Sequence, residues 1–423
     1  MLEEYVVKQQ ELPIHLLKTE KYKTTNIALH LKTDLTKEKA THRALLSNVL
    51  KSATKNYPSR KDIRLYLDEL YGATLATNVQ KIGDWHILSF YLTVVNDQFI
   101  ETSQLFKKSI AFLQEVLFEP YLDEEGFFSE KIIEEEKRLL KQRIDSIYDD
   151  KIRYANERLI QEMCKNDPFA IHPYGDKNML FEVTKQSLQE EYHRMLQEDD
   201  IRLYIVGNHT KEEVQDAVAS ISISPRPKRE RKIPSQRRRE EKEVREVVEI
   251  DQIGQAKLSM GFCFPVYHAD QNFYAAQVMN GLFGGFPHSK LFMNVREKES
   301  LAYYATSRYE SAKGLLFVYA GIDASQYDKT TRIIKEQLED MVQGKFTDQE
   351  LAQTKMMLKN QLMEAYDSPR SIISMAYKGN VLGKERDLNT WMKGIESVTK
   401  DEVVYVAKLV TLDTCYVLRG EDA

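Results

Sequence analysis

The amino-acid sequence predicts an α+β fold of two homologous domains, each a mostly antiparallel sheet with helices packed on it. Three observations support this prediction. The chain has 423 residues, which is too long for one ordinary hydrophobic core. Some segments alternate apolar and polar residues as strands do, and others repeat apolar residues with the period of a helix. The same order of segments occurs on both sides of a charged, proline-containing linker at residues 222–245.

The first domain is expected to span residues 1–221. Alternating patterns predict strands at residues 26–34, 73–82, 84–95 and 201–208. Helical periodicity predicts helices at residues 41–55, 59–72, 98–118 and about 124–164. The second of these helices begins at Ser59 and stops at Gly72, because serine caps a helix and glycine ends one.

The second domain, residues 246–423, repeats this order. Strands are expected at residues 256–266 and 415–420, with a hairpin at 303–322 that turns at Lys313-Gly314. Helices are expected at residues 272–284, 290–299, 327–344 and 347–367. Neighbouring strands set beside groups of helices are typical of antiparallel α+β layers.

Composition excludes several classes of function. The chain has no run of eighteen apolar residues, and residues 1–31 are charged, so neither a membrane span nor a signal peptide is expected. The net charge of −5 does not favour nucleic acid. The cysteines fit no metal or disulfide pattern, which favours a reducing cytoplasm; they are Cys164, Cys263 and Cys415. The basic run at 225–239 could be an anionic-surface patch, but its prolines and the glutamates that follow favour a solvated linker.

The segment GLFGGFPHSKLFMNVREKESLAYYA, residues 281–305, resembles a substrate-binding element of pitrilysin-type (insulinase family) zinc peptidases. In that family an Arg and a Tyr seven residues apart bind the substrate, and Arg296 and Tyr303 have this spacing. Further similarity lies at residues 51–77, HPYGDKNML (172–180) and LYIVGNHTKEEV (203–214). The resemblance implies a clamshell of two domains with a cavity between them, and substrate-binding roles for Arg296 and Tyr303.

The metal site of the family is degenerate in this chain. The family ligates zinc with H-x-x-E-H on a helix and with a Glu on a later helix. Ala44, Ser47 and Asn48 stand at the motif positions, and Gln142 or Arg143 stands at the later one. Alanine cannot ligate zinc, serine cannot act as the base, and an arginine there would repel the metal. We therefore expect no cofactor in this chain.

Three features have competing interpretations. Arg296 and Tyr303 could be a surface arginine and a core tyrosine, but their matching flanks favour a substrate-binding pair. The run Glu134-Glu135-Glu136 could hold a metal, but consecutive residues fan out around a helix, so a solvated face is favoured. Gly281, Gly284 and Gly285 lack the Lys-Ser/Thr of a phosphate loop and favour close backbone approach.

The resemblance therefore predicts a non-catalytic, substrate-binding subunit of a heterodimeric zinc endopeptidase that acts on peptides, as some bacterial family members do. The expected partners are a zinc-bearing homologous subunit and a peptide, with no nucleic acid and no membrane. The isolated chain is expected to be inactive and could form a homodimer. The alternative is an inert scaffold or peptide-binding protein of the same family. A third possibility, an enzyme with an unrelated site, has no nucleophile–base pattern to support it.

Overall fold

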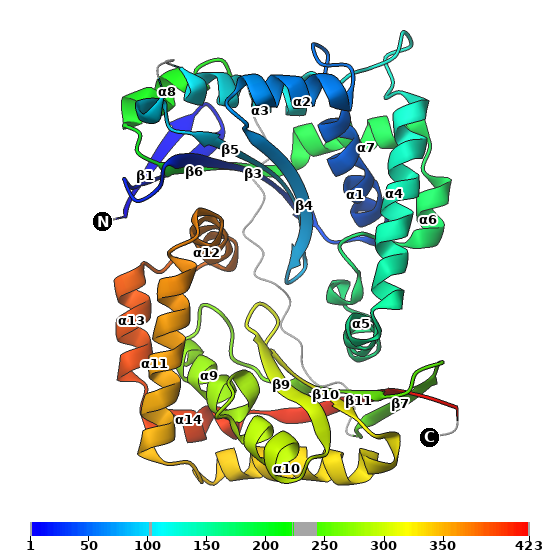
Figure 1. Ribbon diagram of the computed structural model, residues 1–423, viewed down its shortest axis with the longest axis vertical. Helices are drawn as coiled ribbons and strands as arrows, with labels where there is room; N and C mark the ends of the chain where they lie inside the picture. Colours follow the sequence, from blue (N-terminus) through cyan, green and yellow to red (C-terminus); the bar gives the residue numbers. More distant parts are fainter. Residues whose placement is uncertain (1, 101–103, 222, 224–242, 422–423) are drawn as a thin grey trace. The chain divides into compact units, whose positions relative to one another are not determined.

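The computed structural model describes residues 2–100, 104–221, 223 and 243–421 of the chain. These residues form two compact units (Figure 1). The first unit contains the described residues up to Ser146, those from Ile171 to Ile223, and the short segment Pro369–Ser374. The second unit contains Ile147–Ala170 and most of the C-terminal half. The linker predicted at 222–245 lies almost entirely outside the described residues, as does the basic run within it.

The first unit is built on a 6-stranded sheet with the order β1-β2-β6-β3-β5-β4. Its strands are β1 (Glu3–Gln9), β2 (Leu12–Lys18), β3 (Thr24–Asp34), β4 (Thr74–Ile82), β5 (Trp85–Val95) and β6 (Asp200–Gly207). Strands β2 and β6 pair in parallel, and the other neighbours pair antiparallel. The mostly antiparallel sheet agrees with the prediction.

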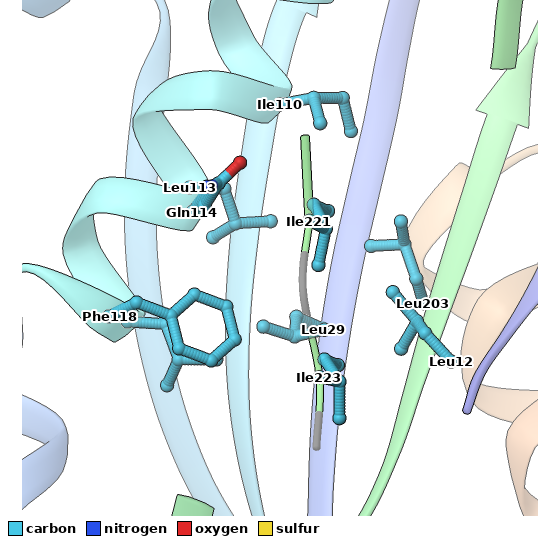
Figure 2. Close-up of a pocket in the computed structure, with 10 residues that line it drawn as sticks. Leu12, Leu29, Ile110, Leu113, Gln114, Phe118, Leu203, Ile221 and Ile223 are labelled. Carbon is cyan, nitrogen blue, oxygen red and sulfur yellow. The ribbon is translucent and has the colours of Figure 1, made fainter. Parts of the chain in front are cut away.

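Helices of the first unit pack on this sheet around one large apolar core (Figure 1). They are α1 (Lys37–Ser52), α2 (Arg60–Glu69), α3 (Leu105–Phe118), α4 (Glu130–Asp149), α6 (Lys177–Glu182), α7 (Lys185–Glu198) and α8 (Lys211–Val218), with a short turn η1 (Asp97–Phe99). A void of about 20 Å³ remains between α3 and the sheet. Figure 2 shows that its walls are almost entirely aliphatic and aromatic, so this void offers no polar group for chemistry beyond Gln114.

The second unit has a 5-stranded sheet with the order β7-β11-β8-β10-β9. Its strands are β7 (Arg245–Ile250), β8 (Ala256–Cys263), β9 (Ala302–Glu310), β10 (Leu315–Ile322) and β11 (Thr411–Arg419). Read across its sheet, each set of five strands has the same order along the chain: β2 to β6 lie in the order first, fifth, second, fourth, third, and so do β7 to β11. The parallel pair β7–β11 corresponds to β2–β6. The predicted duplication is therefore visible in the strand topology.

Helices cover both faces of the second sheet. One face packs against α9, α10 and α14 through alternate strand residues such as Met260 and Val318. The other face packs against α5 through residues such as Phe317 and Tyr416. The elements are α5 (Lys151–Met163), η2 (Pro168–Ala170), α9 (Phe273–Asn280), η3 (Gly281–Gly285), η4 (Phe292–Lys298), η5 (Ala324–Gln326), α10 (Tyr327–Val342), α11 (Asp348–Ala365), α12 (Pro369–Leu382), α13 (Leu388–Ser397) and α14 (Lys400–Ala407).

The predicted single helix at 124–164 is wrong, because it is two helices that belong to different units. Helix α4 ends at Asp149, and Asp150 has non-helical angles of φ −80° and ψ 91°. The Asp150 side chain accepts hydrogen bonds from the backbone N–H groups of Ile152 and Arg153 and so caps α5. The helix predicted at 98–118 also begins later than expected, at Leu105.

One fully buried cation anchors each unit. In the first unit, Arg43 on α1 donates to Asp199 Oδ2 at 2.5 Å and to His86 Nδ1 at 3.0 Å. In the second unit, Lys313 at the β9–β10 turn donates from Nζ to Asp167 Oδ2 at 2.8 Å. Asp167 follows α5, so this ion pair ties the α5 segment to the second sheet. None of the described helices is long and apolar enough to cross a membrane.

Candidate functional site

The degenerate metal positions lie on α1, a helix capped by Thr36, whose side chain accepts a hydrogen bond from Lys39 N. Ala44, Ser47 and Asn48 are buried, with exposed fractions of 1%, 4% and 7%. Ser47 Oγ and Asn48 Nδ2 both donate to the carbonyl oxygen of Ala44, at 2.8 and 3.1 Å. The two polar side chains therefore donate hydrogen bonds to the backbone of their own helix.

A pocket of about 330 Å³ lies between this helix and α4. It is lined by Asn48, Lys51, Arg60, Glu136, Leu139, Leu140 and Arg143. Of the residues at the motif positions, Asn48 and Arg143 both line this pocket, whereas Ala44 and Ser47 do not. The lining contains three cationic side chains and one carboxylate.

The pocket has the electrostatics of an anion site rather than a metal site. Burial lowers the pKa of Lys51, Glu136 opposes this shift, and Arg143 and Arg60 reinforce it. Zinc requires several unprotonated donors, and an excess of positive charge opposes its binding. The residues present do not fit the zinc of the family. Across the described ranges, no group of three or more His, Cys, Asp or Glu residues could hold a metal ion.

Glu136 corrects one expectation from the sequence. Glu134 and Glu135 are largely exposed, as predicted for a solvated helix face, but Glu136 is only 3% exposed. Its carboxylate accepts a hydrogen bond from Ser52 Oγ at 2.5 Å and pairs with Arg60. The buried carboxylate is therefore satisfied by one cation, Arg60, and one hydroxyl, Ser52.

His42, the histidine nearest the motif positions, has a structural role. Its Nδ1 lies 2.9 Å from the carbonyl oxygen of Glu38, and its Nε2 lies 3.1 Å from Ser187 Oγ. Both ring nitrogens are therefore engaged by α1 itself and by α7.

The second predicted site lies in the other unit, on the segment that runs from α9 to β9. Two glycines here are required by close packing, as expected. A Cβ atom at Gly281 would lie 2.6 Å from Thr354 Cγ2, and one at Gly284 would lie 2.7 Å from the backbone nitrogen of Ser307. Any side chain at these positions would push η3 away from its neighbours.

Arg296 lies in η4, a π-helical turn, where the sequence predicted an ordinary helix. Its side chain is 43% exposed, and its nearest carboxylate belongs to its sequence neighbour Glu297, with Nε 3.5 Å from Oε1. The guanidinium carbon also lies 4.6 Å from the centre of the Phe292 ring. Both contacts are local, so the guanidinium keeps donors available for a ligand.

Tyr303 lies at an irregular position on the edge strand β9. Ser300, just before the strand, has a left-handed φ of +51°, which is uncommon for a residue other than glycine. Ala302 pairs with Ile322 and Tyr304 pairs with Gly321, so Tyr303 is the extra residue of a β-bulge. Its side chain is 79% exposed. Tyr303 is therefore not a core tyrosine.

The sequence did not predict three backbone features of this segment: the π-turn, the left-handed Ser300 and the β-bulge. Single π-turns and β-bulges are frequent at functional sites, and bulges redirect a side chain. Here a π-turn holds Arg296, a left-handed Ser300 follows, and a bulge turns Tyr303 outward. Nothing in the sequence from Glu297 to Leu301 signals a positive φ, because it has neither glycine nor asparagine.

Comparisons with known proteins agree with the motifs. A family model described as "Peptidase M16 inactive domain" matches residues 182–358, which include Arg296 and Tyr303. The chain is 39% identical to the "Probable inactive metalloprotease YmfF" of Bacillus subtilis (strain 168), over 97% of this chain and 96% of that protein. It is 25% identical to the "Uncharacterized zinc protease YmxG" of the same strain, over 66% and 68% of the two chains.

Among solved structures, a conserved protein from Enterococcus faecalis V583 has the same fold. The TM-score is 0.93 with 33% sequence identity, and the match covers 99% of each chain. The near-complete coverage of this structure and of the Bacillus relative extends the likeness to both units. This chain therefore belongs to the M16 peptidase family, the pitrilysin and insulinase family, as a homologue of a probable inactive metalloprotease.

Proposed function

We propose that this chain is the non-catalytic, substrate-binding subunit of a heterodimeric zinc endopeptidase that acts on peptides in the cytoplasm. A homologous subunit with an intact metal motif supplies the zinc, and this chain supplies Arg296 and Tyr303. Zinc proteases among the relatives support a family in which zinc-bearing and zinc-less chains coexist. The three cysteines, all buried and outside any disulfide, suit a reducing compartment.

The observation that carries the proposal is the irregular, outward-facing segment from Arg296 to Tyr303. A segment that serves only packing gains nothing from a left-handed serine and a bulge, since residues in sparsely populated conformations cost about 1–3 kcal/mol each. Ser300 lies between Arg296 and Tyr303, and the bulge is at Tyr303 itself; the contacts of Arg296 are with its near neighbours Phe292 and Glu297. An inert scaffold, the alternative function, would not need this arrangement.

The chemistry of the two side chains suits a peptide. A tyrosine O–H and a guanidinium both donate hydrogen bonds, and a peptide carbonyl accepts them. Guanidinium groups also form forked hydrogen bonds, which orient an extended substrate. Donors aimed at a carbonyl oxygen that gains negative charge during hydrolysis stabilise the transition state. These residues would therefore hold and polarise a peptide whose cleavage depends on the partner subunit.

The test of this assignment is co-purification with a zinc-bearing homologue from the same cell, followed by metal analysis. We expect a complex of one copy of each chain with one zinc, and no stoichiometric zinc on the isolated chain after dialysis against a weak chelator. About one zinc on the isolated chain, lost when residues of α1 are substituted, would contradict the proposal.

A further inference from the structure

The second unit contains a pocket of about 290 Å³ between α11, α12, α13 and the segment around His268. It lies at the small end of the range of small-molecule sites. Its lining residues are His268, Phe273, Gln277, Ser311, Leu358, Gln361, Leu362, Ala365, Met375, Lys378, Gly379, Lys384, Arg386, Trp391 and Ile395. The segment of Arg296 and Tyr303 contributes none of them, so ligand binding in this pocket is independent of the proposed function.

The charged side chains that line this pocket are all cationic. Lys378, Lys384 and Arg386 line it, and no aspartate or glutamate does. The Arg386 guanidinium is held by the backbone: Nη2 donates to the carbonyl oxygen of His268 at 2.6 Å. Its Nε is buried and has no acceptor among the described residues. A half-buried guanidinium without a carboxylate is unfavourable, because its desolvation is not repaid by a countercharge.

His268 Nε2 contacts two groups of opposite hydrogen-bonding character. It lies 2.9 Å from Arg386 Nη1, which can only donate, and 3.2 Å from the carbonyl oxygen of Lys384, which can only accept. The other ring nitrogen, Nδ1, is buried and has no hydrogen-bond partner within the described protein. His268 is only 6% exposed, and burial, reinforced by the charge of Arg386, lowers its pKa to about 3. The ring is therefore neutral near pH 7, so the positive charge at this part of the pocket comes from Arg386 and the two lysines.

The pocket also has an apolar wall, which begins next to Arg386. Trp391 packs edge-on against Phe273, with ring centres 5.2 Å apart, and Arg386 stacks over the Phe273 ring at 4.4 Å. Leucines of α11 and Ile395 continue this wall. A ligand that fits would therefore combine acceptors or negative charge with an apolar body.

We infer that this pocket binds a carboxylate attached to a compact apolar group, with the carboxylate among Lys378, Lys384 and Arg386 and the apolar group against Trp391 and Leu362. Two sources supply this chemistry: a medium-chain fatty acid, or the free C-terminus of a peptide that ends in an apolar residue. Both would provide the negative charge that the three cations lack and the apolar surface that the wall would cover.

Trp391 provides a direct readout. The chain has only two tryptophans, and Trp391 lines the pocket, so its fluorescence reports occupancy. We expect a saturable fluorescence change with octanoate, and binding at least about tenfold weaker for octanol and for acetate, because each lacks one half of the recognised chemistry. The free acid and the amide of N-acetyl-Ala-Leu test the peptide source. Tighter binding of the peptide acid than of octanoate assigns the site to a C-terminus, and the reverse assigns it to a fatty acid. Trp391→Phe should abolish the signal.

The double variant Lys378→Gln/Lys384→Gln should weaken binding of the preferred acid by about tenfold or more. The matched control is Lys393→Gln, an exposed lysine on α13 that does not line the pocket, which should bind as the wild type does. The comparison of octanoate with octanol uses the unmodified chain, so a folding defect in a variant cannot obscure the result. Equal affinity for octanoate and octanol, or no saturable change with any of the acids, would overturn the inference.

Discussion

The two candidate half-sites have opposite structural characters. On α1, the residues at the metal positions are buried, and their donors bond to the same helix. On the segment from η4 to β9, Arg296 and Tyr303 are exposed at 43% and 79%, and irregular backbone turns Tyr303 outward. The residues of the first half-site are packed within their unit, whereas the exposed side chains of the second suit the binding proposed for them.

Because of this difference, we expect substitutions in the two half-sites to have different effects: on stability at α1, and on ligand binding at Arg296 and Tyr303. Helix α1 also carries Arg43, whose buried guanidinium joins the helix to Asp199 and His86. Changes on α1 should therefore affect folding of the first unit and leave ligand binding by the second unit intact. Changes at Arg296 or Tyr303 should do the reverse. One tryptophan lies in each unit, Trp85 on β5 and Trp391 on α13, so unfolding of the two units can be followed separately.

The largest expected effect is on stability. Arg43→Met should lower the free energy of unfolding of the first unit by about 3–5 kcal/mol, because it leaves Asp199 buried without its cation. Urea unfolding, followed by Trp85 fluorescence in a Trp391→Phe background, measures it. The control Arg202→Met removes a more exposed ion pair with Asp200 and should cost at most about 1 kcal/mol. Equal losses of unfolding free energy in Arg43→Met and Arg202→Met would show that the buried ion pair on α1 has no special role in stability.

Tyr303→Phe should lower the turnover of an active pair by about two to three powers of ten, because it removes one donor to the transition state. Its thermal midpoint should stay within error of the wild type, since the hydroxyl is exposed. Tyr405→Phe, another exposed tyrosine of the second unit, serves as the control and should leave turnover unchanged. A similar loss in both variants would show that the position of Tyr303 is not special.

Arg296→Ala should weaken the binding of an unstructured peptide to the pair by about tenfold or more, because a charged donor to the peptide backbone is lost. The zinc content of the partner should not change, since Arg296 is not needed for the metal. Arg332→Ala removes an exposed arginine of α10 and should bind peptide normally. Fluorescence anisotropy with a labelled peptide distinguishes these outcomes.

The smallest expected effect is a difference in acid sensitivity. Burial lowers the pKa of His30 and His86 in the first unit to about 3, and does the same for His268 in the second. An unfolded histidine titrates near pH 6.5, so between about pH 3 and 6.5 the unfolded chain binds more protons than the folded chain. The stabilisation is complete above that range and is lost as pH falls through it.

The first unit has one more such histidine than the second, so it should lose about 1 kcal/mol more stability between pH 6 and pH 5. Urea unfolding of the single-tryptophan variants Trp85→Phe and Trp391→Phe at the two pH values measures the difference. The opposite order, with the second unit more acid-sensitive, would contradict this account.

Local sequence signals predicted much of the fold and part of the site. Periodicity located the strands from β3 to β6 and from β8 to β10, and Ser59 and Gly72 marked the ends of α2. The break at Asp150 was not predicted, because the helical pattern continues through it and only the packing of α5 in the other unit requires a second helix.

At the site, motif spacing indicated Arg296 and Tyr303, and substitution of the motif indicated the degenerate metal helix. The bulge at Tyr303 depends on pairing with β10, and the cationic pocket on α1 depends on contacts with α4. Glu136 was expected at a solvated face and is buried, since Arg60 and Ser52 approach it from other elements. Such contacts join residues that are far apart in the chain, so no local pattern in a single sequence predicts them.

The central claim is that this chain contributes its Arg296–Tyr303 segment to a partner that holds the zinc. The most direct test is a peptidase assay of the purified chain, of a zinc-bearing homologue, and of their equimolar mixture. We expect no cleavage of an unstructured peptide by the chain alone, cleavage by the mixture, and loss of most of that gain with Tyr303→Phe. Cleavage by the chain alone that a chelator does not stop, or a mixture no more active than the homologue, would contradict the account.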